Sequence, residues 1–158
     1  MDKRPKVVYY LTLLWVALSS IFVLWGGFSL IVLMQIEGWS GELGQLTPQV
    51  FFGYLISTIV WFVFSSVFII FAYATFRGDS WSWTTGLIIS TIFVIIFGFM
   101  LASFIVTSIL FLGNWFGVYG LITVVLSFLT DLGIIFLITR PITKLYFAAD
   151  SSKKEKLV

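Results

Sequence analysis

Four long apolar blocks constrain the fold of this chain more than any other feature. Each is long enough to cross a hydrocarbon core of about 30 Å as a helix, because a helix rises about 1.5 Å per residue. The blocks are Val7–Met34, Val50–Phe76, Trp83–Leu112 and Phe116–Thr139. Apolar residues make up 60% of the 158 residues, more than a soluble domain of this length usually carries. The sequence therefore predicts an all-α integral membrane protein, with a four-helix bundle in residues 1–147 and a charged cytoplasmic tail in residues 148–158.

The Lys and Arg residues predict how the chain is oriented in the membrane. All nine lie outside the blocks: three precede the first block, Arg77 separates the second from the third, and five follow the fourth. The connections 35–49 and 113–115 contain none, and the first of them contains Glu37 and Glu42. Basic residues concentrate in the cytoplasmic loops of membrane proteins. We therefore expect a multi-pass protein of the cell membrane, with both termini and the middle connection in the cytoplasm.

Aromatic and basic residues near the block ends are the predicted interfacial anchors, because amphipathic rings and long cationic side chains prefer the headgroup region. These anchors are Trp39, Trp81, Trp83, Arg140, Lys144 and Tyr146. The connection 35–49 is expected to lie along the outer membrane surface, held there by Trp39. The fourth helix should end at Arg140, because proline disfavours helical geometry at the residue before it. The basic ends are also expected to attract anionic lipid headgroups.

The residue types that the chain lacks narrow its chemistry. With no cysteine and no histidine, it excludes disulfides, thiolate nucleophiles, Cys/His zinc sites and haem held by either residue. The usual Ser–His pairing of a serine nucleophile is excluded for the same reason. Acid–base catalysis inside the membrane needs at least two convergent groups, and the blocks contain one acid, Asp131. We therefore expect no enzyme activity, no cofactor, no bound metal and no nucleic-acid partner.

Asp131 is the polar residue that most needs an explanation. About 13 Å of helix separates it from Arg140, which is too deep for a short side chain to reach the interface. An aspartate near the bilayer centre costs about 2.5–3.5 kcal/mol on insertion scales. Ser127 and Thr123 share its helix face at near-helical spacing. We expect Asp131 to face the bundle and to bond hydroxyl groups of a neighbouring helix, either as a structural contact or as a proton carrier.

A possible internal repeat adds Ser66 to this candidate intramembrane polar site. The segments Ser19–Leu30 and Ser90–Leu101 are identical at seven of twelve positions. This similarity reflects either a duplicated helical hairpin or chance resemblance between two apolar segments. A duplication would make Ser66 the counterpart of Asp131 in the second helix.

Small residues and deep tryptophans indicate where the helices pack. Close helix approach in lipid depends on small residues, and Gly98, Ala102 and Gly120 are the candidate packing positions. Three tryptophans lie deeper than the interfacial ones, at positions 15, 25 and 61. These rings either line a ligand pocket or pack against other helices and lipid.

Two segments in the C-terminal half of the chain carry a resemblance. The segment FRGDSWSWTTGL and the segment TRPITKLYF resemble the corresponding parts of small four-helix membrane proteins from archaea and bacteria. Those proteins have Gly-x-x-Trp-x-Trp in the middle loop and Arg-Pro-x-x-Lys-x-Tyr-Phe at the end. This chain departs from them at Asp79, where a basic residue is more familiar. The resemblance implies the four-helix architecture and, because the family has no assigned activity, no catalytic residues.

Two functions from different classes remain open at this point. The first is a non-catalytic subunit, stabiliser or scaffold that binds other membrane proteins, or further copies of itself, through helix–helix contacts. The alternative is a component of a proton or ion pathway that uses Asp131. The first is favoured because the chain has small-residue helix faces and little polypeptide outside the blocks.

Overall fold

The structure is a computed structural model, and it describes the backbone of residues 5–39, 48–111 and 115–155. Side chains are described within residues 5–34, 51–103 and 118–148. The described residues form five helices and no strand. These helices are α1 (Lys6–Trp39), α2 (Pro48–Arg77), α3 (Ser80–Phe111), α4 (Trp115–Ile138) and α5 (Pro141–Glu155). The predicted all-α fold and its four long apolar helices are confirmed.

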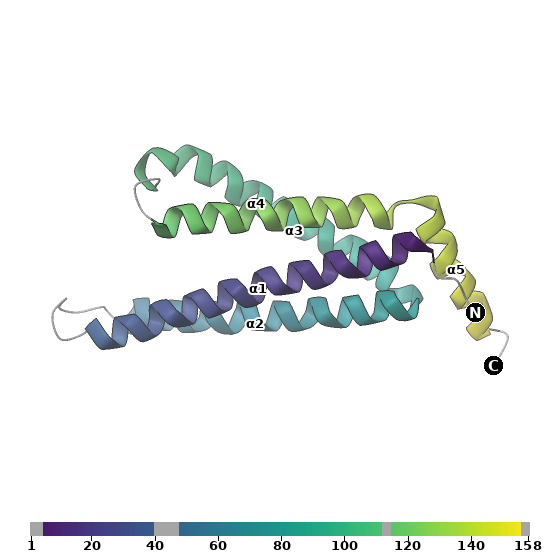
Figure 1. The fold of residues 1–158 in the computed structure, drawn as a ribbon, viewed down its shortest axis with the longest axis horizontal. Helices are drawn as coiled ribbons and strands as arrows, with labels where there is room; N and C mark the ends of the chain where they lie inside the picture. Colours follow the sequence, from purple (N-terminus) through teal and green to yellow (C-terminus); the bar gives the residue numbers. More distant parts are fainter. Residues whose placement is uncertain (1–4, 40–47, 112–114, 156–158) are drawn as a thin grey trace.

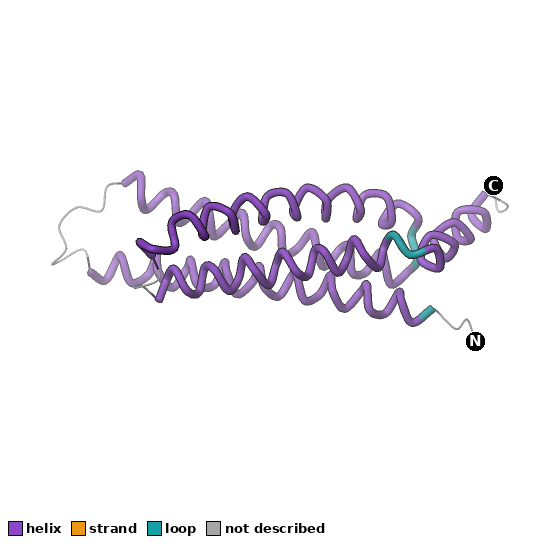
Figure 2. Tube along the Cα trace, turned by 90° about the horizontal axis from the view of Figure 1, so that it is seen from above, coloured by secondary structure: helices purple, strands orange, loops and turns teal. Residues whose placement is uncertain are grey.

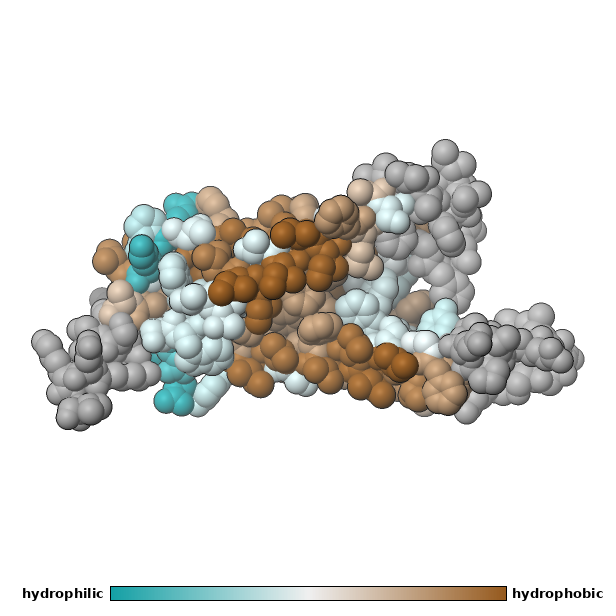
Figure 3. Space-filling view, turned by 180° about the vertical axis from the view of Figure 1, so that it is seen from behind, coloured by the Kyte–Doolittle hydropathy of each residue, from teal (hydrophilic) through white to brown (hydrophobic). Residues whose placement is uncertain are grey.

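The first four helices are long and apolar enough to cross a membrane, and they run along the long axis of the molecule (Figures 1 and 2). One end of the bundle holds the start of α1, the α2–α3 turn and the end of α4; we call it the terminal end. The opposite end, where α1 and α3 finish, is the loop end. Figure 3 shows apolar residues across the middle of one face and hydrophilic residues gathered at the terminal end.

The four helices do not pack equally. α1 packs along α2 over most of its length and also against α4, while α3 packs mainly against α4. α3 runs obliquely behind α4, and its backbone approaches α2 far less (Figure 1). Aromatic rings fill the space between these two helices: the Phe93 ring lies 5.2 Å from the ring of Phe64 and 5.3 Å from that of Phe68. The core of the bundle is therefore mainly aromatic.

The turn between α2 and α3 is two residues long and depends on Gly78. This glycine has a φ of 84°, in the left-handed region that favours glycine. The Asp79 N–H donates to the Ala74 carbonyl at 3.0 Å, and the Gly78 N–H donates to the Thr75 carbonyl at 3.1 Å. Together these bonds form a Schellman motif, which satisfies the last carbonyls of α2. As a result, α3 begins at Ser80, earlier than the predicted Trp83.

α4 ends at Ile138, two residues before the predicted Arg140, and side chains complete its last turn. The Thr143 hydroxyl donates to the Leu137 carbonyl at 2.7 Å, and the Trp83 indole donates to the Ile138 carbonyl at 2.8 Å. The last carbonyls of a helix have no partner in the regular helix pattern, and here the Trp83 indole supplies one to Ile138. The Leu137 carbonyl also accepts from the Arg140 N–H at 3.3 Å. The two side-chain bonds also join α3 and α5 to the end of α4.

The predicted boundaries are wrong at two places. Residues 141–155 form one helix, α5, so the expected boundary between a domain of residues 1–147 and a tail of residues 148–158 falls inside this helix. Proline at the first position suits a helix start, so Pro141 begins α5 as well as ending α4. α5 also buries Phe147 and Thr143 against the terminal end. Residues 35–39 continue α1 and do not form a surface connection, while residues 40–47 lie outside the described residues.

Candidate functional site

Asp131 lies in the interior of the bundle, at 0% exposure. It belongs to a stripe on α4 whose members recur every three or four residues and are all buried. The stripe consists of Val124, Ser127, Asp131, Ile134 and Ile138. This spacing places them on one helix face, which points toward α1 and α3. The expectation that Asp131 faces the bundle is therefore confirmed.

The hydrogen bonds expected for Asp131 are not formed. Neither carboxyl oxygen has a hydrogen-bond partner among the described residues. The hydroxyl of Thr123 donates to the Tyr119 carbonyl of its own helix at 2.9 Å. In helices, threonine hydroxyls readily bond the carbonyl one turn back, which satisfies them locally. The carboxyl group is thus buried without the partners that a purely structural role would supply.

Two other buried polar groups without partners lie close to the level of Asp131: the Trp15 indole N–H on α1 and the Ser90 hydroxyl on α3. The atoms that an added Cβ would meet at each glycine show which residues of neighbouring helices lie at the same height along the bundle. A Cβ at Gly86 would lie 3.1 Å from the Trp15 ring and 3.3 Å from Ile138, and one at Gly98 would lie 3.7 Å from Phe128.

On α4, Asp131 lies between Phe128 and Ile138, the two residues that these glycines approach. On α3, Ser90 lies between Gly86 and Gly98. A Cβ at Gly133 would lie 3.2 Å from Leu14, which places Trp15 within about one helical turn of Asp131. Three helices therefore bring unpartnered polar groups to one short section of the bundle. A sequence signal existed for Asp131 alone, since serine and tryptophan are common in apolar helices.

Ser66 does not belong to this site, so its assignment from the possible repeat is wrong. Its side chain is exposed, and its hydroxyl donates to the Phe62 carbonyl of α2 at 2.9 Å. The neighbouring Ser65 is the buried serine of this helix: its hydroxyl lies 2.8 Å from that of Ser19 on α1. A difference of one residue rotates a helical position by about 100°, which separates the inward and outward faces.

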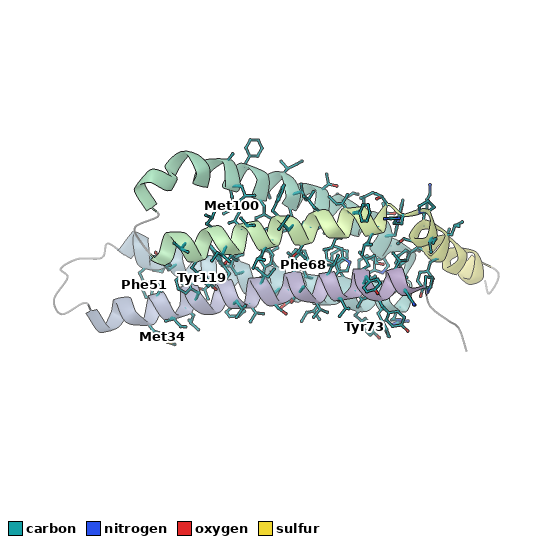
Figure 4. The ribbon with its side chains drawn as sticks, turned by 45° about the horizontal axis from the view of Figure 1, so that its top comes forward. Met34, Phe51, Phe68, Tyr73, Met100 and Tyr119 are labelled. Atoms are coloured by element: carbon teal, nitrogen blue, oxygen red, sulfur yellow. The ribbon has the colours of Figure 1, made fainter. Side chains whose placement is uncertain are left out.

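A small cavity of about 10 Å³ lies about one helical turn from Asp131, toward the loop end, and Asp131 itself does not line it. All four long helices contribute to it, including Trp25 of α1, Trp61 of α2 and Met100 of α3. Ser127 and Thr123 are among its lining residues, one and two turns from Asp131, but the surface of the cavity is almost entirely apolar. Met100, which lines the cavity from α3, and Tyr119, near the start of α4, are labelled in Figure 4. A volume of about 10–15 Å³ could hold about one water molecule, but a cavity with so apolar a surface offers water few polar partners.

The deep tryptophans divide between packing and lining the cavity. Trp15 is fully buried and stacks on Phe71 with ring centroids 5.1 Å apart. Trp25 and Trp61 line the cavity, with their ring centroids 5.6 Å apart. The Trp61 indole donates to the Ser57 hydroxyl at 2.9 Å, which fixes its orientation.

The predicted packing residues have different environments. Gly98 faces Phe128 of α4, and Gly120 is buried inside the bundle. Ala102, one turn beyond Gly98, is exposed and does not take part in a packed pair with it. Two glycines outside the predicted set, Gly27 and Gly53, have no described atom within 4 Å of the position that an added methyl group would take. Gly27 and Gly53 are therefore additional candidates for contacts outside the bundle, beside the exposed Ala102.

The interfacial anchors also differ from one another. Trp81 is 46% exposed, Lys144 is exposed, and the guanidinium of exposed Arg140 lies 4.2 Å from the centroid of the Phe136 ring. Tyr146 instead packs against Gly78, where an added Cβ would lie 2.9 Å from its hydroxyl oxygen. Trp83 is held by its bond to α4, so its role in the structure is to join two helices. Trp39 ends α1, and its side chain lies outside the described residues.

No protein-family model, curated protein or solved structure matches this chain. Within the described ranges, no group of three or more Asp or Glu residues is placed to hold a metal ion. The arrangement around Asp131 is therefore interpreted from its own geometry: a buried carboxyl group, two neighbouring polar groups without partners, and a cavity one turn away.

Proposed function

We propose that the chain is a multi-pass protein of the cell membrane, with the terminal end of the bundle in the cytoplasm. The four long apolar helices support insertion. Arg77 and Arg140 both lie at the terminal end, which agrees with the preference of basic residues for the cytoplasmic side. Because the chain has no cysteine, single cysteines can report the orientation directly.

Labelling with a membrane-impermeant maleimide tests this orientation. Cysteines replacing Lys6 and Gly78 should react only from the cytoplasmic side. Cysteines replacing Gly41 and Asn114, which lie outside the described residues, should react only from the opposite side. Labelling of position 41 from the cytoplasmic side alone would refute the proposed orientation.

We propose further that the protein is a non-catalytic subunit, stabiliser or scaffold that binds another membrane protein, or a second copy of itself, through its helix faces. One observation carries this proposal: at Gly27 of α1 and Gly53 of α2, described atoms leave the space in front of the backbone open. Gly53 is exposed as well. Helix association in lipid depends on close backbone approach at small residues. The loop-end half of the α1–α2 hairpin therefore offers a partner helix two positions for close approach.

Leucine substitutions at these glycines test the proposal. Gly27→Leu and Gly53→Leu fill the space that a partner helix would use, without an expected clash inside the bundle. Ser66→Leu is the matched control, because it is also a small-to-large change at an exposed position of α2. Overpacking a helix contact costs about 1–3 kcal/mol, which weakens association by about five- to 150-fold.

The measurement is purification in mild detergent followed by mass spectrometry of co-eluting proteins, together with cross-linking of two differently tagged copies. A stoichiometric partner, or a second copy, should be lost from both glycine variants and retained in Ser66→Leu. Retention of the partner in both glycine variants would exclude this face as the contact.

Anionic lipid headgroups are a further proposed partner, at the terminal end. Ile142 and Leu145 of α5 are 60% and 70% exposed, and Lys144 lies between them in sequence. A helix that presents apolar and basic residues side by side suits the membrane interface. Each basic residue near an anionic surface contributes about 1 kcal/mol. Replacing Arg140 and Lys144 by glutamine should therefore weaken binding of the purified protein to anionic lipid, while binding of neutral lipid stays unchanged.

A second candidate function is a component of a proton pathway, and the burial of Asp131 without hydrogen-bond partners favours it. A group that costs stability and is not used for packing is typical of functional sites. Asp131→Asn keeps the size of the side chain and removes its titration. Loss of proton flux in liposomes with unchanged stability would support this candidate, while unchanged flux would exclude it.

A further inference from the structure

We propose that the outer face of α4 binds one phospholipid with a negatively charged headgroup, its phosphate held by Arg140 and Lys144 and an acyl chain lying along the apolar side chains that lead to Phe136. The inference rests on the proposed membrane location and on anionic lipid as a proposed partner. It goes further than a general attraction of the terminal end to anionic lipid, because it assigns one lipid molecule to one defined site.

The outward face of α4 carries an unbroken row of apolar side chains, which we call the outer stripe. Its members recur every three or four residues, and this spacing places them on one helix face. The buried stripe that contains Asp131 occupies the opposite side of the same helix. The outer stripe consists of Ile122, Leu126, Leu129, Leu132 and Phe136, whose exposed fractions range from 39% to 58%.

Two cationic side chains follow the outer stripe at the terminal end, where α4 meets α5 (Figure 1). The guanidinium of Arg140 lies 4.2 Å from the centroid of the Phe136 ring, within the range of cation–π attraction. The Lys144 N–H donates to the Arg140 carbonyl at 3.1 Å, so Lys144 lies one helical turn beyond Arg140. Both side chains are exposed. A phosphate group beside Arg140 is therefore also within reach of a second cation.

The depth of these groups fits a lipid of one leaflet. The apolar span of α4 ends at Ile138, so Arg140 lies where the hydrocarbon core gives way to headgroups. The helix rises about 16 Å between Leu129 and Arg140, which is about half of a hydrocarbon core of about 30 Å. A lipid whose phosphate lies at Arg140 therefore extends its chain past Phe136 and Leu132 to Leu129 within its own leaflet.

Charge complementarity identifies the headgroup. The acidic side chains that the structure describes are Asp79, in the α2–α3 turn, and Asp131, inside the bundle. Within the described ranges, neither of them forms an ion pair with Arg140 or Lys144. Arginine and lysine both bind phosphate, and two cations without an acidic partner favour a headgroup with net negative charge. An apolar stripe that ends at such a pair matches a molecule with an acyl chain and an anionic headgroup.

α2 has a similar arginine–aromatic pair at the terminal end, and this pair supplies a matched control. The guanidinium of Arg77 lies 5.6 Å from the centroid of the ring of Tyr73, which is labelled in Figure 4. Arg77 follows Tyr73 by four residues, as Arg140 follows Phe136. The next charged residue after Arg77 is the acid Asp79, whereas the next one after Arg140 is a lysine. The α2 pair therefore has similar geometry without the second cation.

Native mass spectrometry of the full chain in detergent, titrated with dioleoyl phosphatidylglycerol, tests the site. The native protein should bind one such lipid saturably, and more tightly than dioleoyl phosphatidylcholine, which has the same chains and no net charge. Arg140→Gln and Lys144→Gln should each weaken this binding about fivefold, while Arg77→Gln should change it by less than about twofold. Dihexanoyl phosphatidylglycerol, whose short chains cover less of the outer stripe, should bind about tenfold or more weakly.

Photocross-linking supplies a second readout that needs no variant. A phosphatidylglycerol with a photoreactive acyl chain is added to the native protein, and the labelled residues are identified by mass spectrometry. Label should concentrate on residues 129–136 of α4 and exceed the label on the outer face of α2, residues 59–73. Equal labelling of the two helices would overturn the proposal.

The variants also separate this site from the general lipid attraction on which it rests. Equal weakening of phosphatidylglycerol binding by Arg77→Gln and Arg140→Gln would overturn the α4 site and leave the general attraction in place. Unchanged binding in both Arg140→Gln and Lys144→Gln would overturn the site and the proposed anionic lipid partner together.

Discussion

Replacing Asp131 by leucine should stabilise the bundle, although the change removes a buried side chain from its centre. Leucine has the same branching at Cγ as aspartate, so its two methyl groups point in about the directions of the two carboxyl oxygens, although each methyl group is larger than an oxygen. Those oxygens have no hydrogen-bond partner among the described residues, and the side chain is 0% exposed. The substitution therefore removes no hydrogen bond and adds apolar contacts in a site of similar shape.

The magnitude follows from the burial of the carboxyl group. Leaving a buried polar group without a partner costs about 1–3 kcal/mol in protein stability. Insertion scales set an upper bound, because aspartate and leucine at the helix centre differ by about 3–4 kcal/mol. We expect Asp131→Leu to raise the free energy of unfolding by about 1–3 kcal/mol, which corresponds to a change of about five- to 150-fold in the unfolding equilibrium.

Steric trapping in bicelles, or unfolding in sodium dodecyl sulfate followed by tryptophan fluorescence, measures this difference. Thr130→Val is the matched control, because it is also a polar-to-apolar change of equal shape on α4, and the Thr130 hydroxyl bonds only the Leu126 carbonyl of its own helix. The control should change stability by less than about 0.5 kcal/mol. A loss of stability greater than about 1 kcal/mol in Asp131→Leu would refute the reasoning, because it would mean that the carboxyl group has stabilising partners.

Two further substitutions test the packing of the bundle. Gly78→Ala should destabilise the protein by about 1–2 kcal/mol, because its φ of 84° is strained for alanine and the new methyl group would lie 2.9 Å from the Tyr146 hydroxyl; Gly53→Ala, in open space on α2, is the control and should not destabilise it. In a double-mutant cycle, Ser19→Ala and Ser65→Ala should show a coupling energy of about 0.6 kcal/mol, because the two hydroxyls are 2.8 Å apart across α1 and α2; additive effects of the two changes would contradict this hydrogen bond.

The existence of the four long helices could be predicted from the sequence, because the length and apolarity of each block are local properties. That α4 ends before Pro141 was equally predictable, since proline restricts the residue before it. The burial of Asp131 followed from the cost of placing a carboxyl group against lipid. α5 was missed because its first residue, Pro141, was interpreted only as the end of the preceding helix.

Which side of each helix points into the bundle could not be predicted in the same way. α2 and α3 are apolar on all sides, so their sequences contain no polar stripe that would mark the outward face. In lipid, apolar surface is equally acceptable inside and outside the bundle, and the rotation of each helix depends on how its side chains fit those of its neighbours. This fit turns Ser65 inward and Ser66 outward, although the two are adjacent in sequence.

The candidate site depends both on the sequence and on the tertiary structure. Sequence alone identifies Asp131, because an acid inside a long apolar block is unusual and costly wherever the helix turns. Only the packing of α1, α3 and α4 brings Trp15 and Ser90 near its level, and only the shapes of the side chains leave a cavity beside Ser127. Cavities arise from the mismatch of side chains that lie far apart in the sequence, and no local pattern records that mismatch.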